Sequence, residues 1–151
     1  MEQKDKELLL KDLCARLPYE VKCNVGERIP YTLCRIEIDN VNGHLLDFIE
    51  TKDDLDMQVY LSEVKPYLFP LTSITEEQNK ILIKNYHFSF NSCSDGITNG
   101  IYSPTFNRTI YYSVDEDDIS KIIDWLNKNH FDYRALIEKG LAIDATELNI
   151  Y

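Results

Sequence analysis

The residue types best suited to chemistry gather in the segment 130–134, which contains His130, Asp132, Tyr133 and Arg134. The Arg134 guanidinium can bind a carboxylate or phosphate with two hydrogen bonds, and the N-terminus of a following helix would add a positive dipole. This combination predicts a site for a small ligand, an anion above all. A structural interpretation is favoured over ligand binding. In it, Asp132 caps the next helix, His130 lies at the negative end of the preceding helix, and Phe131 and Tyr133 pack the two helices together. Helix junctions often need these residue types for structure alone.

A second candidate is the acidic run formed by Asp115, Glu116, Asp117 and Asp118. Four adjacent carboxylates predict a surface that binds a basic partner protein. The alternative is that they form the first turn of a helix, where negative side chains stabilise the helix dipole. Of the two interpretations, the helix turn is the more common in proteins.

Patterns for catalysis, metal binding and nucleotide binding are weak. Cys93 follows His87 closely, but no third group that would orient such a pair is evident. The cysteines lack the close ligand pairs of a zinc site, and the acidic stretch 53–56 lacks the glycine and final glutamate of a calcium loop. Glycine-rich phosphate-binding motifs are absent from the sequence. We therefore expect no catalytic residue, no metal and no cofactor.

Composition narrows the classes of protein and of partner. The chain has 151 residues, 26 acidic and 16 basic side chains, a net charge of -10 and 44% hydrophobic residues. This length predicts a single domain, 1–151, with its own hydrophobic core. The negative charge disfavours direct binding to a nucleic-acid backbone or an anionic membrane. Since no apolar run is long enough for a signal peptide or a membrane span, we expect a cytoplasmic protein with reduced cysteines.

The elements that position these residues begin with an N-terminal helix that ends near Pro18. Its apolar residues recur at i, i+3, i+4 and i+7, and charged residues lie on the opposite face. The next segments, 21–25, 34–38, 45–50 and 57–61, have the composition or the two-residue alternation of half-buried antiparallel strands. The apolar helix positions are Leu10, Leu13, Cys14 and Leu17, the charged ones are Lys11, Asp12 and Arg16, and the inward strand positions include Cys23 and Cys34.

The segment 64–71 contains Pro66 and Pro70, which argue against a central strand or a helix interior, so we interpret it as an extended segment across the core. Thr75 and Gln78 form a capping box, which predicts a helix over 76–86. The range 109–114 has the character of a further strand.

A second capping box, Ser113 with Glu116, predicts a helix whose apolar stripe is Ile119, Ile122, Ile123 and Leu126. Asp132 then caps another short helix, which Gly140 ends. Together these elements predict an α+β fold: a single domain with an antiparallel β-sheet and about four helices packed mainly on one face.

Three segments carry a resemblance to other proteins. They are 64–75 (VKPYLFPLTSIT) with the following Glu76-Glu77, 123–134 (IDWLNKNHFDYR) continuing through 136–142 (LIEKGLA), and 12–19 (DLCARLPY). Over about a third of its length the chain resembles a group of small uncharacterised proteins of gut anaerobic bacteria and of their phages or prophages. The group usually carries a basic residue where Phe69 stands and a glycine where Ala135 stands. The resemblance implies a habitat but no activity and no catalytic residue.

Two functions remain as hypotheses. The first is a non-enzymatic phage or prophage accessory factor that binds another protein, which the net charge and the acidic run at 115–118 favour. The second is a small-molecule or nucleotide-binding protein, or a minor enzyme, that uses the cluster at 130–134.

Overall fold

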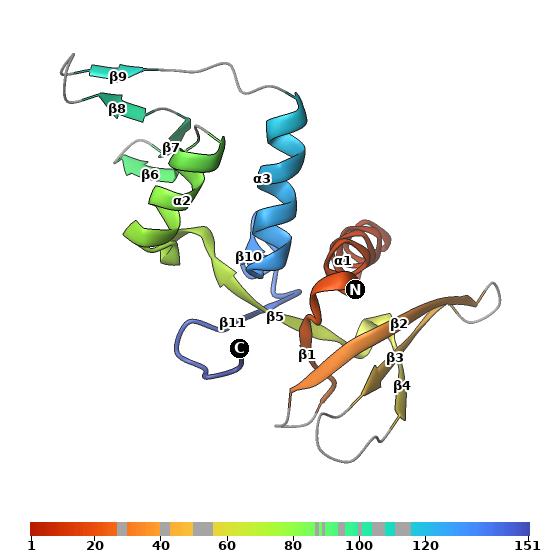
Figure 1. The fold of residues 1–151 in the computed structure, drawn as a ribbon. Coiled ribbons are helices and arrows are strands. Elements are labelled where there is room, and N and C mark those ends of the chain that lie inside the picture. The colour runs from red at the N-terminus through yellow and green to blue at the C-terminus, as the bar shows by residue number, and fades with distance from the viewer. Residues whose placement is uncertain are drawn as a thin grey trace.

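Helices and strands both build the structure, a computed structural model of the chain (Figure 1). It describes residues 1–26, 30–39, 43–49, 56–86, 88, 90–93, 96–99, 101–103, 108–110 and 116–151. Figure 1 shows β5 running between two parts of the molecule, with β1 to β4 at one end and the helices α2 and α3 at the other.

The largest unit is a seven-stranded sheet whose bonded neighbours follow the order β10–β5–β1–β2–β3–β4, with β11 also paired to β5. Neighbours among β1 to β5 pair antiparallel, whereas β10 and β11 run parallel to β5. The sheet is therefore mixed, and the prediction of an antiparallel sheet is correct only for its longer strands. The bounds are β1 Lys22–Asn24, β2 Tyr31–Asp39, β3 Gly43–Ile49, β4 Asp56–Tyr60, β5 Lys65–Pro70, β10 Phe131–Asp132 and β11 Ile143–Asp144.

Strand β5 joins the two parts because both of its edges are bonded. The backbone N–H of Phe69 donates a hydrogen bond to the carbonyl of His130, and the carbonyl of Leu68 accepts one from the N–H of Ala145. The N···O distance is 2.9 Å in both bonds. These two groups belong to one peptide unit and point in opposite directions. The C-terminal part of the chain therefore holds β5 from both sides.

The two prolines do not exclude β5 from the centre of the sheet, so the expectation that they argue against a central strand is wrong. Pro66 lies opposite Cys23 near the start of the strand, and Pro70 lies opposite Asp132 at its end. The N–H groups that prolines lack are therefore not those that hold the middle of the strand. The segment is extended, as predicted, and lies at the centre of the sheet.

Three α-helices are described, α1 Gln3–Arg16, α2 Glu76–Tyr86 and α3 Glu116–Lys128. The predicted range of α2 is confirmed. The N–H of Thr75 donates to Oε1 of Gln78 in 2.9 Å, and the N–H of Gln78 donates to Oγ1 of Thr75 in 3.2 Å, which is the predicted capping box. Ser113, of the second predicted box, lies outside the described residues.

The buried face of α1 differs by one position from the predicted stripe. Leu9, Asp12, Leu13 and Arg16 are buried, whereas Cys14 is exposed. Asp12 and Arg16 were expected on the polar face, and that expectation is wrong. Their charges turn inward because they pair with each other, as described below.

The fourth predicted helix does not form. Residues 133–140 make a series of turns between β10 and β11. Ala135 has a φ of 56°, in the left-handed region, which interrupts a right-handed helix at that point. Gly140 also has a positive φ, 68°, which fits its predicted role at the end of the segment.

Short 3₁₀ helices complete the connections, and two small hairpins pair separately from the main sheet. The 3₁₀ helices are η1 Leu17–Tyr19, η2 Leu61–Glu63 and η3 Leu71–Ser73, and the hairpin strands are β6 Phe90–Cys93 with β7 Gly96–Asn99 and β8 Ile101–Ser103 with β9 Arg108–Ile110. Strand β9 covers only the start of the predicted range 109–114, because 111–115 lies outside the described residues.

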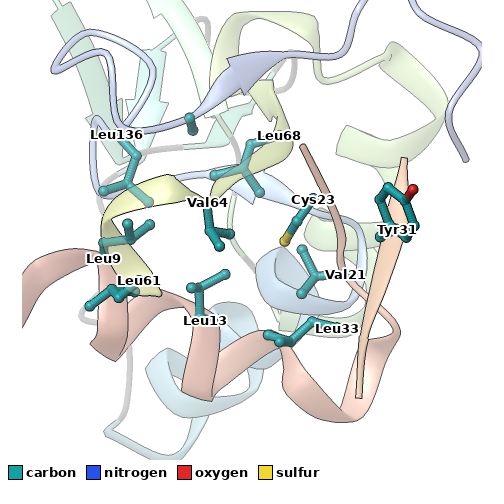
Figure 2. Close-up of a cluster of buried hydrophobic side chains, with 11 residues drawn as sticks. Leu9, Leu13, Val21, Cys23, Tyr31, Leu33, Leu61, Val64, Leu68 and Leu136 are labelled. Atoms are coloured by element: carbon teal, nitrogen blue, oxygen red, sulfur yellow. The ribbon is translucent and has the colours of Figure 1, made fainter. Parts of the chain in front are cut away.

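Buried apolar side chains form two clusters, one in each part of the molecule. The larger cluster joins α1 to β1, β2, β5 and η2, and Figure 2 shows its leucine and valine side chains converging between them. The smaller cluster centres on Ile122, Leu126 and Phe131, between α3 and the second half of β5. Whether the range 1–151 is one domain stays a prediction.

Candidate functional site

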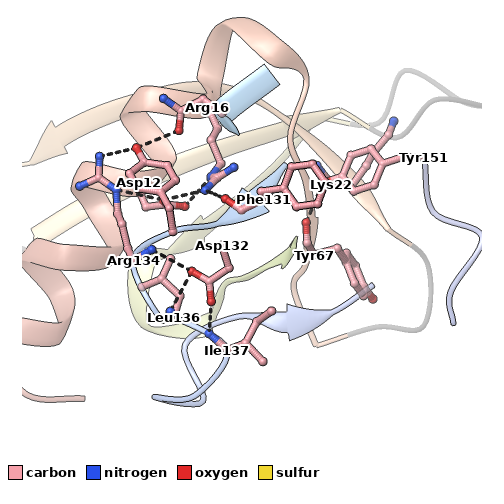
Figure 3. A network of polar contacts seen from close by, with 12 residues as sticks. Asp12, Arg16, Lys22, Tyr67, Phe131, Asp132, Arg134, Leu136, Ile137 and Tyr151 are labelled. Atoms are coloured by element: carbon pink, nitrogen blue, oxygen red, sulfur yellow. Dashed lines mark hydrogen bonds and ion pairs between the residues drawn. The ribbon is translucent and has the colours of Figure 1, made fainter. Parts of the chain in front are cut away.

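A buried ion pair on α1 is the centre of the most polar region of the interior. Asp12 and Arg16 both have 0% exposure and are four residues apart, which places them on one helix face. Nε of Arg16 donates to Oδ2 of Asp12 in 2.7 Å, and Nη2 donates to Oδ1 in 3.1 Å. Nη2 also donates to the carbonyl of Phe131 in 2.7 Å, so the pair ties α1 to β10 (Figure 3).

Arg134 brings a second guanidinium to the same carboxylate. Its Nε lies 3.3 Å from Oδ1 of Asp12, at an angle that gives charge attraction rather than a hydrogen bond. Its Nη2 donates to the hydroxyl of Tyr133 in 2.8 Å, and that hydroxyl donates to Oδ1 of Asn127 in 3.0 Å. The guanidinium also lies 4.8 Å from the centre of the Tyr133 ring, within the range of a cation–π contact.

Asp132 acts on the backbone of the turns that follow it. The N–H groups of Leu136 and Ile137 donate to Oδ1 and Oδ2 in 2.9 and 2.8 Å, and the N–H of Arg134 donates to Oδ1 in 3.3 Å (Figure 3). The predicted capping role is therefore correct in kind, because the carboxylate satisfies backbone donors. The object it caps is a series of turns and not a helix.

His130 lies apart from this ion cluster, at the end of α3. Its ring stacks on Tyr151 with 3.9 Å between ring centres and 14° between planes, and only 8% of the residue is exposed. Burial, together with the positive charges of Arg16 and Lys22, lowers the pKa of His130 to about 4. The imidazole is therefore neutral at pH 7.

Tyr151 joins β1 and β5 where their direct pairing stops. Cys23 pairs with Pro66, so the next pair along this register is Lys22 with Tyr67. The N–H of Lys22 instead donates to the hydroxyl of Tyr151 in 3.1 Å, and that hydroxyl donates to the carbonyl of Tyr67 in 2.8 Å. The phenol thus bridges the two strands, and its burial raises the pKa of Tyr151.

The four residues predicted as one ligand site have separate contacts. Tyr133 and Arg134 belong to the ion cluster, Asp132 binds backbone N–H groups, and His130 stacks on Tyr151. These contacts match the structural interpretation for Asp132, which binds backbone N–H groups as a cap does. Ligand binding by the four together stays a prediction.

Sequence reasoning missed Asp12 and Arg16, the most buried charges of the described residues. The available signal was their opposite charge at i and i+4, on a face that also carries Leu9 and Leu13. A helix face chosen from its apolar residues alone is displaced by one residue from the face that is buried.

The predicted acidic partner surface is described only in part. Asp115 lies outside the described residues, and Glu116 is the first residue of α3. Asp117 is exposed, whereas Asp118 forms an ion pair with Nζ of Lys121 at 3.2 Å, one helical turn away. The first turn of α3 therefore holds carboxylates as the structural interpretation predicts.

The apolar stripe of α3 divides into a buried and an exposed half. Ile122 and Leu126 are buried in the smaller cluster. Ile119 and Ile123, one turn apart, are 45% and 37% exposed. The outer half of the predicted stripe is therefore left in contact with solvent.

The cysteines do not suggest a reactive site in the part of the chain that is described. Cys23 is buried, and burial together with the charge of Asp12 raises its pKa, which keeps its thiol protonated. Cys34, expected to face inward, is exposed, so that expectation is wrong. His87 and the side chain of Cys93 lie outside the described residues.

Neither a metal-binding group nor a membrane-spanning helix is found among the described residues. No three or more His, Cys, Asp or Glu side chains are grouped there as metal ligands would be. The described helices are too short or too polar to cross a bilayer. Comparison with protein-family models gives no match, and searches of curated proteins and of solved structures find no significant similarity.

Proposed function

We propose that this protein is a non-enzymatic accessory factor, of the phage or prophage type, which acts by binding another protein through the outer face of α3. One observation carries this proposal. Ile119 and Ile123, one helical turn apart, form an exposed apolar patch on α3, while the other apolar residues of its stripe are buried. Single exposed apolar side chains are ordinary on protein surfaces, whereas adjacent ones on one face are typical of interaction sites.

The charges near this step indicate the chemistry of the partner. Asp117 and Asp124 are exposed on α3, where Asp124 accepts a hydrogen bond from the hydroxyl of Tyr19, and the whole chain carries a charge of -10. A partner surface with an apolar centre and basic residues around it complements this arrangement. Attraction between exposed charges speeds association and is screened by salt, whereas the two isoleucines supply the buried centre.

The ion cluster supports a non-enzymatic role. Asp12, Arg16 and Arg134 make their contacts with one another and with neighbouring groups of the chain. Catalytic acids and bases need a pKa suited to proton transfer and access to a substrate. Asp12 and Arg16 lie inside the molecule, without access to a substrate in solvent, so the cluster serves to hold α1 against the C-terminal part of the chain.

Capture with matched variants tests this proposal. The wild-type protein, the Ile119→Ser/Ile123→Ser double variant and Leu148→Ser are immobilised and exposed at low salt to lysate of the cells that make the protein. The exposed fraction of Leu148, 42%, is similar to that of each isoleucine, but Leu148 lies on the C-terminal segment and not on α3. Its variant therefore controls for lost apolar surface. Each captured protein is then purified, and its affinity for all three forms is measured by calorimetry.

We expect one basic protein to bind the wild type and Leu148→Ser equally, and to bind the double variant at least about 30-fold more weakly, as for central apolar contacts of an interface. Equal binding of that protein to all three forms would place the interface elsewhere. Absence of any captured protein that distinguishes the forms would overturn the proposal.

A further inference from the structure

An open hollow of about 500 Å³ lies beside the ion cluster and shares only His130 with the predicted site at 130–134. It is bounded by Ser73 of η3 and Thr75 before α2 on one side, and by Lys128 of α3 and Thr146 near the C-terminus on the other. This volume is within the range of sites that bind small molecules. The hollow is separate from the exposed face of α3 that carries Ile119 and Ile123.

One side of the hollow is aromatic. The rings of Phe69 and Phe131 have centres 6.1 Å apart, and those of Phe69 and Tyr151 are 5.8 Å apart. Both distances are typical of packed aromatic rings. Such a wall favours a flat apolar or aromatic group over a compact hydrated ion, because it offers surface to bury and few hydrogen bonds.

The charge of the hollow is opposite to that of the protein. Lys128 is the one charged side chain among the described residues that line it, in a chain whose net charge is -10. The remaining polar lining consists of hydroxyl, amide and imidazole groups. A ligand with a single negative charge is therefore attracted to this place, while the rest of the surface repels it.

His130 supplies a polar group that the fold leaves without a partner. Its Nδ1 is buried and has no hydrogen-bond partner among the described residues. Only 8% of the residue is exposed, so bulk solvent does not readily supply that partner. Its backbone has a φ of 57°, in the left-handed region that non-glycine residues rarely adopt. Strained residues and unsatisfied polar groups in one place are typical of binding sites.

We propose that this hollow binds a small aromatic carboxylate, with its ring against Phe69 and Tyr151, its carboxylate toward Lys128 and a polar ring substituent toward His130. The inference is independent of the proposed interaction with a protein, because it concerns other residues and is tested on the isolated chain. It also narrows the ligand-binding prediction for 130–134 to one residue, His130.

Titration followed by ¹H–¹⁵N NMR tests the proposal. The probes are 4-hydroxybenzoate, the uncharged 4-hydroxybenzamide, and acetate as an anion without a ring, each added up to 10 mM. We expect 4-hydroxybenzoate to give saturable shifts at Thr75, Lys128 and His130. The amide is expected to bind about fivefold more weakly, as for loss of an ion pair at an exposed position, and acetate is expected to give no saturation.

Variants on the same helix separate charge from general effects. Lys128→Gln is expected to weaken 4-hydroxybenzoate about fivefold, and Lys121→Gln, which removes an equal charge outside the hollow, less than twofold. His130→Asn tolerates the left-handed backbone and is expected to weaken binding about tenfold while the NMR spectrum stays that of a folded protein. No saturable shift with 4-hydroxybenzoate, equal affinity for the amide, or equal effects of the two lysine variants would overturn the proposal.

Discussion

Among the described residues, Asp12 is the only carboxylate that contacts the buried Arg16 and the part-buried Arg134. A fully buried charge is stable only when a partner and hydrogen bonds replace the water it has lost. Arg16 has both, through Asp12 and the carbonyl of Phe131. The stability of the cluster therefore depends on the negative charge of Asp12.

Asp12→Asn is expected to lower the free energy of unfolding by about 3–5 kcal/mol, because it leaves Arg16 buried without its counter-charge. Urea unfolding at pH 7 measures the change. Asp118→Asn is the matched control, since it breaks an ion pair at the surface and should cost less than about 1 kcal/mol. Equal losses in the two variants would show that the buried pair has no special weight.

His130 makes stability depend on pH below neutrality. Its pKa is about 4 in the folded chain and about 6.5 when unfolded, so between these values the unfolded chain takes up a proton that the folded one does not. Stability therefore falls as the pH drops from 6.5 to 4. The expected loss is about 2 kcal/mol, because the open hollow allows solvent to screen part of the charge.

The His130→Asn variant isolates this effect. Carboxylates titrate in the same pH range in both proteins, so the difference between the two unfolding free energies reports His130 alone. We expect the wild type to lose stability relative to His130→Asn as the pH is lowered from 6.5 to 4. A difference that stays constant over this range would contradict the lowered pKa.

At the scale of elements, the turns at 133–140 take the place of the expected fourth helix. Asp132 was correctly read as a cap, but its two oxygens bond N–H groups as far as Ile137. The backbone of Ala135 is left-handed, with a φ of 56°, which interrupts a right-handed helix there. A carboxylate before a short polar segment predicts a capped turn as well as a capped helix, so the sequence could not separate the two.

Ala135→Gly is expected to stabilise the protein by up to about 1 kcal/mol, because glycine adopts a positive φ without steric cost. The reciprocal variant Gly140→Ala, at a φ of 68° and with no atom within 4 Å of the added Cβ, should destabilise by about 1 kcal/mol. Thermal unfolding of both variants shows whether each substitution raises or lowers the stability of the folded protein. Destabilisation by Ala135→Gly would contradict the left-handed conformation at this position.

Strand β5 and Tyr151 show a second element that the sequence did not predict. A strand with two prolines was expected outside the centre of a sheet, yet the prolines lie where other strands do not need their N–H groups. The bridging phenol of Tyr151 had no local signal, because it joins segments that are far apart in the chain. By contrast, α2 was predicted with its bounds because Thr75 and Gln78 form a local motif.

Tyr151→Phe removes the hydroxyl while keeping the ring that stacks on His130. The N–H of Lys22 and the carbonyl of Tyr67 then lose their bridging partner, and the expected cost is about 1–2 kcal/mol. Amide hydrogen exchange should show faster exchange at Lys22 while β2 and β3 are unaffected. Unchanged exchange at Lys22 would mean that solvent replaces the phenol without loss.

For the whole molecule, the periodicity and capping patterns of the sequence predicted the mixed use of helix and sheet, but not which surface is exposed. The excess of negative charge is spread over the chain, and part of it has structural roles, as in the ion pair of Asp118. The apolar stripe of α3 was visible in the sequence, whereas its division into buried Ile122 and exposed Ile119 depends on how α3 packs. Sequence periodicity cannot separate a core face from a binding face, because both are apolar.

Site-specific photo-crosslinking in the cells that make the protein tests most directly whether the outer face of α3 binds another protein. A photoreactive phenylalanine analogue is placed at Ile123 or, as the matched control, at Leu148, and crosslinked products are identified by mass spectrometry. We predict one abundant crosslink to a basic protein from position 123, which is lost when Ile119→Ser is added, and none to that protein from position 148. The same products from both positions, or none from position 123, would contradict binding through α3.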